Sequence, residues 1–215
     1  GVVVDIALDP FTTHGHDGVI RAGVVDNDAS LEGLIKQAVN YARAGSDIVA
    51  PSDMMDGRIG AIRAGLDEAG FTQVMIMSYA AKYASSLYAP FRAAVSAGAL
   101  SEIKDKTSYQ MNPANSDEAM REIALDIKEG ADFIMVKPGM PYLDIIRRSV
   151  DQFNIPVFAY QVSGEYQMIQ SLASTLTEDK QKALIMEMLI SFKRAGCTGI
   201  LSYFAYQIAE WWNET

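Results

Sequence analysis

The stretch at residues 133–139 reads Phe-Ile-Met-Val-Lys-Pro-Gly, four apolar residues closed by a lysine, a proline and a glycine. It follows a segment of helical character, residues 116–129, which stops at Gly130. A helix that stops at a glycine and leads into a short apolar run is typical of alternating helices and parallel strands. The same pattern recurs along the chain, so it decides the fold class.

Six short apolar runs have the character of buried strands, and helical segments fill the intervals between them. The strands are expected at Val2–Leu8, Asp47–Pro51, Gln73–Ser78, Phe133–Lys137, Pro156–Val162 and Gly199–Phe204. The helices fit Ser30–Ala44, Arg58–Ala69, Pro90–Ala97, Ser116–Glu129, Tyr142–Phe153, Tyr166–Leu172, Thr177–Ala195 and Tyr206–Trp212. Four helices end at a glycine expected to be left-handed: Gly45, Gly70, Gly130 and Gly196. The alternation predicts an α/β fold with parallel strands.

Two architectures accommodate six such units, an open doubly wound sheet or most of an eight-stranded (β/α)8 barrel of the TIM type. Reactive side chains are expected after several different strands, and no Gly-x-Gly-x-x-Gly follows the first strand, which favours the barrel. We expect a single, partial barrel domain over residues 1–215. Because Gly1 leads directly into a strand, about two βα units are expected to precede it.

The composition excludes several classes of function. The 215 residues are 49% hydrophobic and 21% charged, as expected of a globular domain. A net charge of −9 with scattered basic residues argues against nucleic acid as a partner. The apolar runs are too short to cross a membrane. The one cysteine, Cys197, allows neither an intrachain disulfide nor a thiolate zinc cluster, and it is compatible with a reducing compartment.

Polar residues lie at or near the carboxyl ends of the predicted strands, where they would converge at one edge of the sheet. They are Asp5, Asp9, Ser52, Asp53, Lys82, Lys137, Ser163 and Tyr203. A lysine that closes an apolar strand, as Lys137 does, is costly to place unless it is paired or used. Lys82 lies four residues beyond the strand expected to end at Ser78. Two neighbouring ammonium groups would favour a neutral amine that can attack a ketone, although two unrelated solvated lysines are the simpler alternative.

Five stretches carry a resemblance to a known family. They are residues 5–18, 50–58, 77–85, 135–142 and 160–166; the last reads Tyr-Gln-Val-Ser-Gly-Glu-Tyr. In this order they resemble the porphobilinogen synthase family, also called 5-aminolevulinate dehydratase, and the resemblance extends from end to end of the chain. It implies the condensation of two 5-aminolevulinate molecules into porphobilinogen with loss of two waters, in tetrapyrrole and haem synthesis.

The resemblance also implies a role for each site residue. Lys137 would form the imine with the substrate that supplies the propionate side, and Lys82 the imine on the acetate side, with Asp5 as a further catalytic residue. Ser163 and Tyr203 would bind the substrate carboxylate on the Lys137 side. Arg92, Lys106 and Gln110 would do so on the Lys82 side. Tyr160, Phe91 and Ser52 complete the implied substrate-binding set, and the segment after Lys82 would form a lid.

The resemblance raises a question about metals. Zinc-using members of the family have three cysteines where this chain has Ala7, Asp9 and Asp17, so an active-site zinc is not expected. Asp9 and Asp17 suit Mg²⁺, while a monovalent cation or water alone is also compatible. A separate, activating Mg²⁺ is implied at Glu122 through water. His14 and His16 lack the spacing of a metal pair and are expected to shape the loop by hydrogen bonding.

Partners and alternatives complete these expectations. The family forms homo-oligomers, often octamers, which makes a second copy of the chain the expected partner beside 5-aminolevulinate. A bacterial-type cytosol is the expected location, and an organelle stroma is equally compatible. One alternative is a class I aldolase-type barrel that needs a single essential lysine. The other is a catalytically incomplete piece of the enzyme, because a barrel without two strands has open edges.

Overall fold

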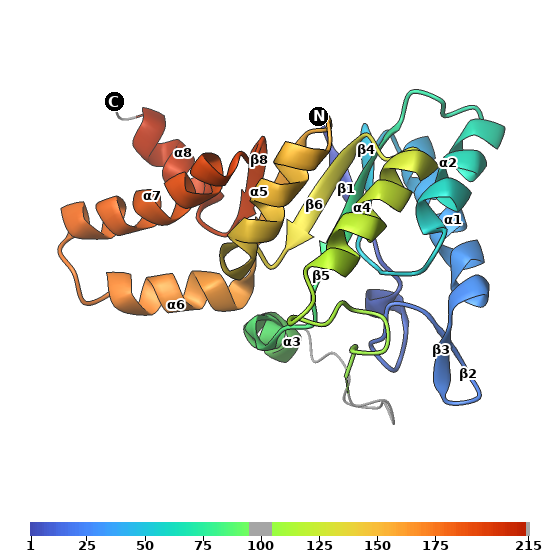
Figure 1. Cartoon of the computed structure of the whole chain (residues 1–215), viewed down its shortest axis with the longest axis horizontal. Coiled ribbons are helices and arrows are strands. Elements are labelled where there is room, and N and C mark those ends of the chain that lie inside the picture. The colour runs from blue at the N-terminus through green and yellow to red at the C-terminus, as the bar shows by residue number, and fades with distance from the viewer. Residues whose placement is uncertain (95–104, 214–215) are drawn as a thin grey trace. The chain divides into compact units, whose positions relative to one another are not determined.

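The computed structural model describes residues 1–94 and 105–213 (Figure 1). The chain divides into two compact units. The first comprises Gly1–Ala84 and Ser96–Met135, and the second Ser85–Val95 and Val136–Thr215. Each unit contains parallel strands and helices, which confirms the predicted α/β class.

The first unit is built on a parallel sheet with the strand order β1-β4-β5-β6. Its strands are β1 (Val3–Ile6), β4 (Ile48–Pro51), β5 (Met75–Lys82) and the beginning of β6 (Phe133–Lys137). Asp5 pairs with Ala50, and Val49 with Ile76. The strands meet the core through fully buried side chains, namely Ile6, Val49, Ile76 and Ile134. These buried apolar side chains fix how the strands pair and therefore where the carboxyl end of each strand lies.

Three longer helices accompany this sheet: α1 (Asn27–Arg43), α2 (Arg58–Glu68) and α4 (Asp117–Glu129). The α1 helix begins after Asp26, whose carboxylate accepts the N–H of Ala29 at 2.9 Å. Its buried residues recur at helical spacing, at Ser30, Leu34, Ala38 and Ala42. Such a stripe explains why α1 packs closely against its neighbours, most extensively against α2.

The first unit departs from the sequence predictions in two places. A hairpin of β2 (Val19–Arg21) and β3 (Val24–Asp26) was not predicted. Its turn places Ala22 and Gly23 at φ of 50° and 80°, and Ala is a rare residue there. The second departure corrects the position of Lys82, which is the last residue of β5 and does not lie beyond it. The strand continues past Ser78 because its second half is buried.

The second unit has the strand order β6-β7-β8 and five longer helical segments. Its strands are the end of β6, β7 (Val157–Gln161) and β8 (Gly199–Ser202), and Phe158 pairs with Gly199 in parallel. The helices are α3 (Ala89–Ala94), α5 (Leu143–Gln152), α6 (Ser163–Ala173), α7 (Glu178–Ala195) and α8 (Ala205–Asn213). Short 3₁₀ turns occur at η2 (Ser86–Tyr88) and η3 (Met140–Tyr142), and at η1 (Asp9–Phe11) in the first unit.

Helix ends were predicted well and helix starts less well. All four glycines, Gly45, Gly70, Gly130 and Gly196, have positive φ. The α6 helix begins at Ser163, three residues before its predicted start. The helix predicted at Pro90–Ala97 is observed as α3, and its last residues lie outside the described part of the chain.

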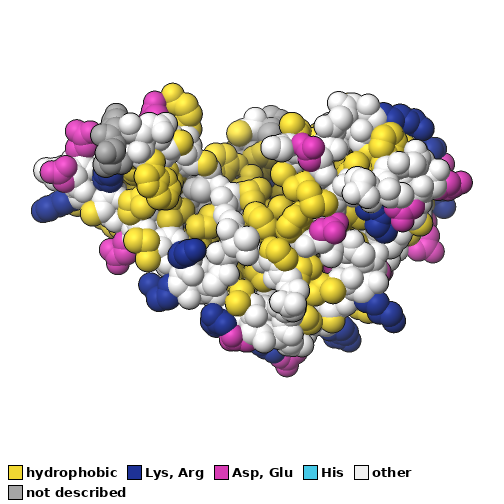
Figure 2. Space-filling model, turned by 90° about the horizontal axis from the view of Figure 1, so that it is seen from above, with side chains coloured by type: hydrophobic (Ala, Val, Ile, Leu, Met, Phe, Trp, Pro, Cys, Tyr) yellow, Lys and Arg dark blue, Asp and Glu magenta, His cyan; other side chains and the backbone are white. Residues whose placement is uncertain are grey.

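Two features of the surface bear on possible partners. Among the described residues, no helix is long and apolar enough to cross a membrane. On the face in Figure 2, Lys and Arg side chains are interspersed with acidic and uncharged groups. Charge of both signs is therefore mixed on this face.

Candidate active site

Lys82 ends β5 in a largely buried position, with only 6% of the residue exposed. Its ammonium group donates a hydrogen bond to the carbonyl of Ser52, which follows β4. The Asp17 carboxylate lies 3.5 Å from Lys82 Nζ. A buried ammonium is held in place when a carboxylate and a carbonyl face it, so the position of this amine is well defined.

Asp17 also pairs with a second lysine, Lys106, at 2.8 Å. The Lys106 ammonium is 3.5 Å from Asp9 as well. Asp17 is 3% exposed at its side chain and Lys106 14%, so the group is largely removed from water. The positive charges of Lys82 and Lys106 thus offset the negative charges of Asp9 and Asp17.

The loop that carries Asp17 is shaped by hydrogen bonds of its histidines, as the sequence predicted. The N–H of His16 donates to Nδ1 of His14 at 3.2 Å. The ring of His16 is hydrogen-bonded to the hydroxyl of Tyr109 at 3.0 Å, and the same hydroxyl accepts the N–H of Asp17 at 3.3 Å. Tyr109 therefore attaches this loop to the segment that contains Lys106.

Beneath these lysines lies a buried polar network centred on Arg58. Its guanidinium group donates to Asp126 at 3.3 Å and to Ser78 at 3.2 Å, and its Nε lies 3.4 Å from Asp53. Asp53 has no exposed surface, and its carboxylate accepts the N–H of Met55 at 2.8 Å. Burial raises the pKa of Asp53 to about 6, although the neighbouring Arg58 opposes the rise. This network was not predicted, because Asp126 is distant from Arg58 in the sequence.

Lys137 ends β6 in the second unit, and aromatic rings surround it. Its ammonium lies 4.4 Å from the centroid of the Tyr160 ring and 5.6 Å from that of Tyr88. The hydroxyl of Tyr88 donates to the carbonyl of Lys137 at 3.3 Å. Aromatic faces attract a cation and provide an apolar wall, which suits both the ammonium and a bound ketone.

Of the two residues predicted to bind a carboxylate on the Lys137 side, Ser163 lies at the start of α6. The hydroxyl of Ser163 accepts the N–H of Phe91 at 3.1 Å and donates to the carbonyl of Leu87 at 3.5 Å. Arg92 was predicted on the Lys82 side; it lies in the second unit on the same segment as Phe91, over the Tyr88 ring at 5.5 Å. The second unit therefore brings together Lys137, Tyr160, Ser163, Phe91 and Arg92, and adds Tyr88, which the sequence did not single out.

The remaining predicted residues are more dispersed. Asp5 lies in β1 with an exposed side chain, and Tyr203 follows β8, 47% exposed, with its ring 5.5 Å from that of Tyr166. Gln110 is buried next to Tyr109 in the first unit. Glu122 lies on α4, where burial and then the nearby carboxylates of Asp56, Asp126 and Glu118 raise its pKa.

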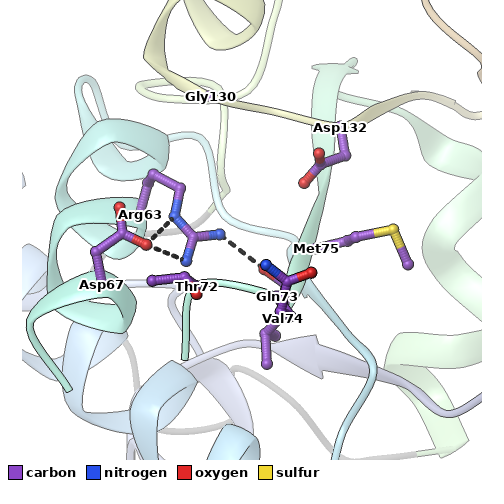
Figure 3. A pocket seen from close by; sticks show the side chains of 8 residues that line it. All are labelled: Arg63, Asp67, Thr72, Gln73, Val74, Met75, Gly130 and Asp132. Atoms are coloured by element: carbon purple, nitrogen blue, oxygen red, sulfur yellow. Dashed lines mark hydrogen bonds and ion pairs between the residues drawn. The ribbon is translucent and has the colours of Figure 1, made fainter. Parts of the chain in front are cut away.

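A hollow of about 440 Å³ lies at the opposite end of β5 from Lys82 (Figure 3). Arg63 forms one wall, but its guanidinium already donates to Asp67 and to the carbonyls of Phe71 and Val74. Reactive groups in parallel sheets gather at the carboxyl ends of strands, so this hollow is not the candidate site.

Comparison with known proteins places this geometry in a family. The model of the family described as delta-aminolevulinic acid dehydratase matches residues 1–211. The delta-aminolevulinic acid dehydratase of Bradyrhizobium diazoefficiens is 59% identical over 210 residues, which cover 98% of this chain and 59% of the relative. The rice chloroplastic dehydratase is 54% identical over 209 residues, covering 97% of this chain and 48% of the relative. The chain thus spans about half to three fifths of the relatives that it matches.

A solved structure agrees with these relatives. The delta-aminolevulinic acid dehydratase (porphobilinogen synthase) of Toxoplasma gondii, in complex with the reaction product porphobilinogen, matches with a TM-score of 0.92. It is 46% identical, and the match covers 97% of this chain and 59% of that one. Sequence and structure therefore point to one family.

Proposed function

The chain belongs to the delta-aminolevulinic acid dehydratase family, and on this premise we propose that it provides the two-lysine active site of a porphobilinogen synthase. The reaction joins two molecules of 5-aminolevulinate into porphobilinogen and releases two waters. The proposal rests on one observation: in this member of the family, Lys82 and Lys137 are each the last residue of a parallel strand. The activity of the whole protein is part of the proposal, because the chain spans only part of its relatives.

Lys137 binds the substrate that becomes the propionate side. Its amine attacks the ketone, water leaves, and the resulting imine is flanked by the rings of Tyr160 and Tyr88. The hydroxyl groups of Ser163 and Tyr203 receive the carboxylate of that substrate. Holding both ends of the molecule makes the later bond-forming steps effectively intramolecular.

Lys82 forms the second imine, with the substrate of the acetate side. Its amine must lose a proton before it attacks, and the Asp17 carboxylate 3.5 Å away can accept that proton. Lys106 remains beside Asp17 and keeps the charge of the group balanced during the transfer. We propose that Lys106, Gln110 and Arg92 bind the second carboxylate, that Ser52 and Phe91 contact substrate, and that Asp5 receives the substrate amine.

A divalent metal does not fit Asp9 and Asp17 in this arrangement. The ammonium groups of Lys82 and Lys106 already lie within 3.5 Å of those carboxylates. The two lysines supply the positive charge that a metal ion would otherwise supply.

An activating Mg²⁺ fits better at Glu122, through water. Burial raises the pKa of Glu122, and the carboxylates of Asp56, Asp126 and Glu118 raise it further although Arg121 opposes them, so acidic groups lie near Glu122. A hydrated Mg²⁺ needs only one or two carboxylates and relieves such crowding. We expect Mg²⁺ to raise the thermal unfolding temperature of the wild type and not that of Glu122→Gln, as measured by calorimetry with and without the ion.

The larger architecture and setting are part of the same proposal. The parallel strands support a TIM-type barrel whose other βα units would lie outside this chain, and the whole protein is proposed to form homo-oligomers. A bacterial-type cytosol or an organelle stroma suits it; the related rice protein is named as chloroplastic. Light scattering on the protein tests the self-association.

The test of the function is direct conversion. The protein is incubated with 5-aminolevulinate, and porphobilinogen is identified by mass spectrometry. Appearance of product that depends on both lysines supports the proposal. If neither porphobilinogen nor a borohydride-stable adduct forms, while the protein is folded by circular dichroism, the proposed activity does not belong to this chain.

A further inference from the structure

Glu165 is a fully buried carboxylate that has no role in the function proposed above. It is the third residue of α6, and one of its oxygens accepts the N–H of Val162 at 2.6 Å, as a residue that caps its own helix does. The same carboxylate accepts the N–H of Gly139 at 3.3 Å and the N–H of Met140. Two of its three donors therefore come from another segment. Burying a carboxylate costs several kcal/mol unless such bonds compensate for lost water.

The segment that Glu165 holds directly follows Lys137. Gly139 is tightly packed, because an added Cβ would lie 3.1 Å from the carbonyl oxygen of Tyr160 and 2.4 Å from the ring of Phe192. Tyr160 is the residue whose ring faces the Lys137 ammonium at 4.4 Å. The backbone after Lys137 is thus fixed by packing on one side and by the Glu165 carboxylate on the other.

The start of α6 is fixed to a second segment in the same unit. Ser163 exchanges hydrogen bonds with Phe91 and Leu87. A Cβ on Gly164 would lie 2.5 Å from the Leu87 carbonyl oxygen, so the two backbones are in close contact. This segment also contains Tyr88, which donates to the Lys137 carbonyl. Glu165 therefore contacts the segment that follows Lys137 and lies in the first turn of α6, which also contains Ser163.

From this arrangement we propose that Glu165 is a positioning residue that sets the separation between the Lys137 amine and the Ser163 hydroxyl. The inference rests on the proposed function, in which one substrate is bound covalently at Lys137 and through its carboxylate at Ser163. Both ends belong to one small molecule, and an error of about 1 Å in such a distance can cost about 100-fold in rate. Glu165 acts through the backbone; its residue has no exposed surface with which to touch a substrate.

Glu165→Gln and Glu165→Asp separate this role from simple helix capping. The glutamine presents an amide N–H group toward one of the backbone donors and so breaks at least one bond across the two segments. The aspartate keeps the negative charge and the local bond to Val162 but is one methylene too short to hold Gly139 and Met140. It is the variant expected to fold even if the glutamine variant does not.

The chain supplies a matched control in Glu129. Its carboxylate accepts the N–H of Gly60 in the first turn of α2 at 3.1 Å, again across a large sequence separation. Glu129 lies in the first unit and holds no segment that adjoins a candidate catalytic lysine. Glu129→Ala therefore removes a bond between distant segments without the proposed coupling.

The probe is 4-oxopentanoate, a ketone with the substrate's carboxylate but without its amine, so the reaction stops at the imine. Borohydride reduction followed by peptide mass spectrometry gives the adduct on Lys82 and Lys137 separately. We expect Glu165→Gln and Glu165→Asp to reduce the Lys137 adduct about 10- to 100-fold and to leave the Lys82 adduct within about twofold. Glu129→Ala should change neither adduct.

Three outcomes would overturn the inference. An undiminished Lys137 adduct in Glu165→Asp means that Glu165 does not position the lysine. If the adducts on Lys82 and Lys137 fall equally, together with the unfolding temperature, Glu165 has only a structural role. If the folded wild type forms no adduct at either lysine, the proposed function fails and this inference fails with it, a result distinct from the first two.

Discussion

Lys82 and Lys137 both end a parallel strand, yet their surroundings differ in kind. Charged groups hold Lys82: Asp17 at 3.5 Å, with Lys106 on the other side of that carboxylate. Lys137 lies against aromatic rings, with Tyr160 at 4.4 Å. The contacts described around Lys82 are mainly between charged groups, whereas those described around Lys137 are with aromatic rings and backbone. The same amine chemistry should therefore respond differently to substitution at the two places.

The largest effect is expected from removing either amine. Lys82→Ala and Lys137→Ala should each lower porphobilinogen formation at least about 1000-fold, because the imine with that substrate cannot form. Product is measured by mass spectrometry at saturating 5-aminolevulinate. Lys128→Ala, on the exposed surface of α4, serves as the control and should keep full activity. Activity within tenfold of wild type in either site variant would remove that lysine from the mechanism.

The next effect concerns the charges around Lys82. Asp17→Asn leaves a buried ammonium group without its carboxylate, which typically costs about 3 to 5 kcal/mol of stability. We expect this loss in denaturant unfolding, together with a diminished adduct on Lys82 and a retained adduct on Lys137. Asp67→Asn breaks only the partly exposed pair with Arg63 and should cost less than about 1 kcal/mol. Equal costs for the two substitutions would mean that Asp17 does not neutralise Lys82.

A smaller effect follows from the raised pKa of Asp53, about 6 against an ordinary value of 3.8. Between these values the folded state keeps the proton and the unfolded state releases it. The stability that this proton contributes is present below about pH 4 and is lost as the pH rises through about 6, an amount on the order of 3 kcal/mol. Asp53→Asn stays neutral throughout. Its free energy of unfolding, relative to wild type, should therefore rise by about that amount between pH 4 and pH 7. A constant difference over this range would contradict the assignment.

The smallest effect tests the backbone support of Lys137. Gly164→Ala forces a shift where the added Cβ would lie 2.5 Å from the Leu87 carbonyl oxygen, at a cost of about 1 to 3 kcal/mol. We expect a weaker adduct on Lys137 and an unchanged adduct on Lys82. In the control Gly33→Ala, the nearest atom belongs to the Leu8 side chain at 3.4 Å, so the added methyl fits and helix stability should not fall. A normal Lys137 adduct in Gly164→Ala would show that the close contact is dispensable.

The sequence predicted the parts of the molecule that depend on local pattern. Apolar runs and terminal glycines located the six parallel strands and the helix ends, since Gly130 and Gly196 are needed where the backbone turns left-handed. The hairpin at 19–26 was missed because its turn, Ala22-Gly23, lacks the usual Asn-Gly or Asp-Gly signal. Lys82 was placed outside β5 because Ser and Ala have weak strand preference, whereas burial decides the strand's true length.

Contacts between distant residues could not be predicted in the same way. The sequence suggested Asp17 only as a metal ligand, which stays a prediction, and did not show that Lys82 and Lys106 meet its carboxylate in the folded chain. Glu165 stood within a family motif without any role, because its bonds to Gly139 and Met140 exist only once α6 is in place. Local sequence patterns predict the helices and strands. The ion pairs and backbone hydrogen bonds of the site form between distant residues and depend on tertiary packing.

Mapping the imines formed on the wild-type protein shows whether both lysines, in their different surroundings, bind substrate. The protein is mixed with isotope-labelled 5-aminolevulinate, reduced with borohydride and digested, and every lysine peptide is examined by mass spectrometry. Label is expected on the peptides that contain Lys82 and Lys137 and on no other lysine. Label confined to a single lysine would contradict it and would indicate a one-lysine mechanism of the class I aldolase type.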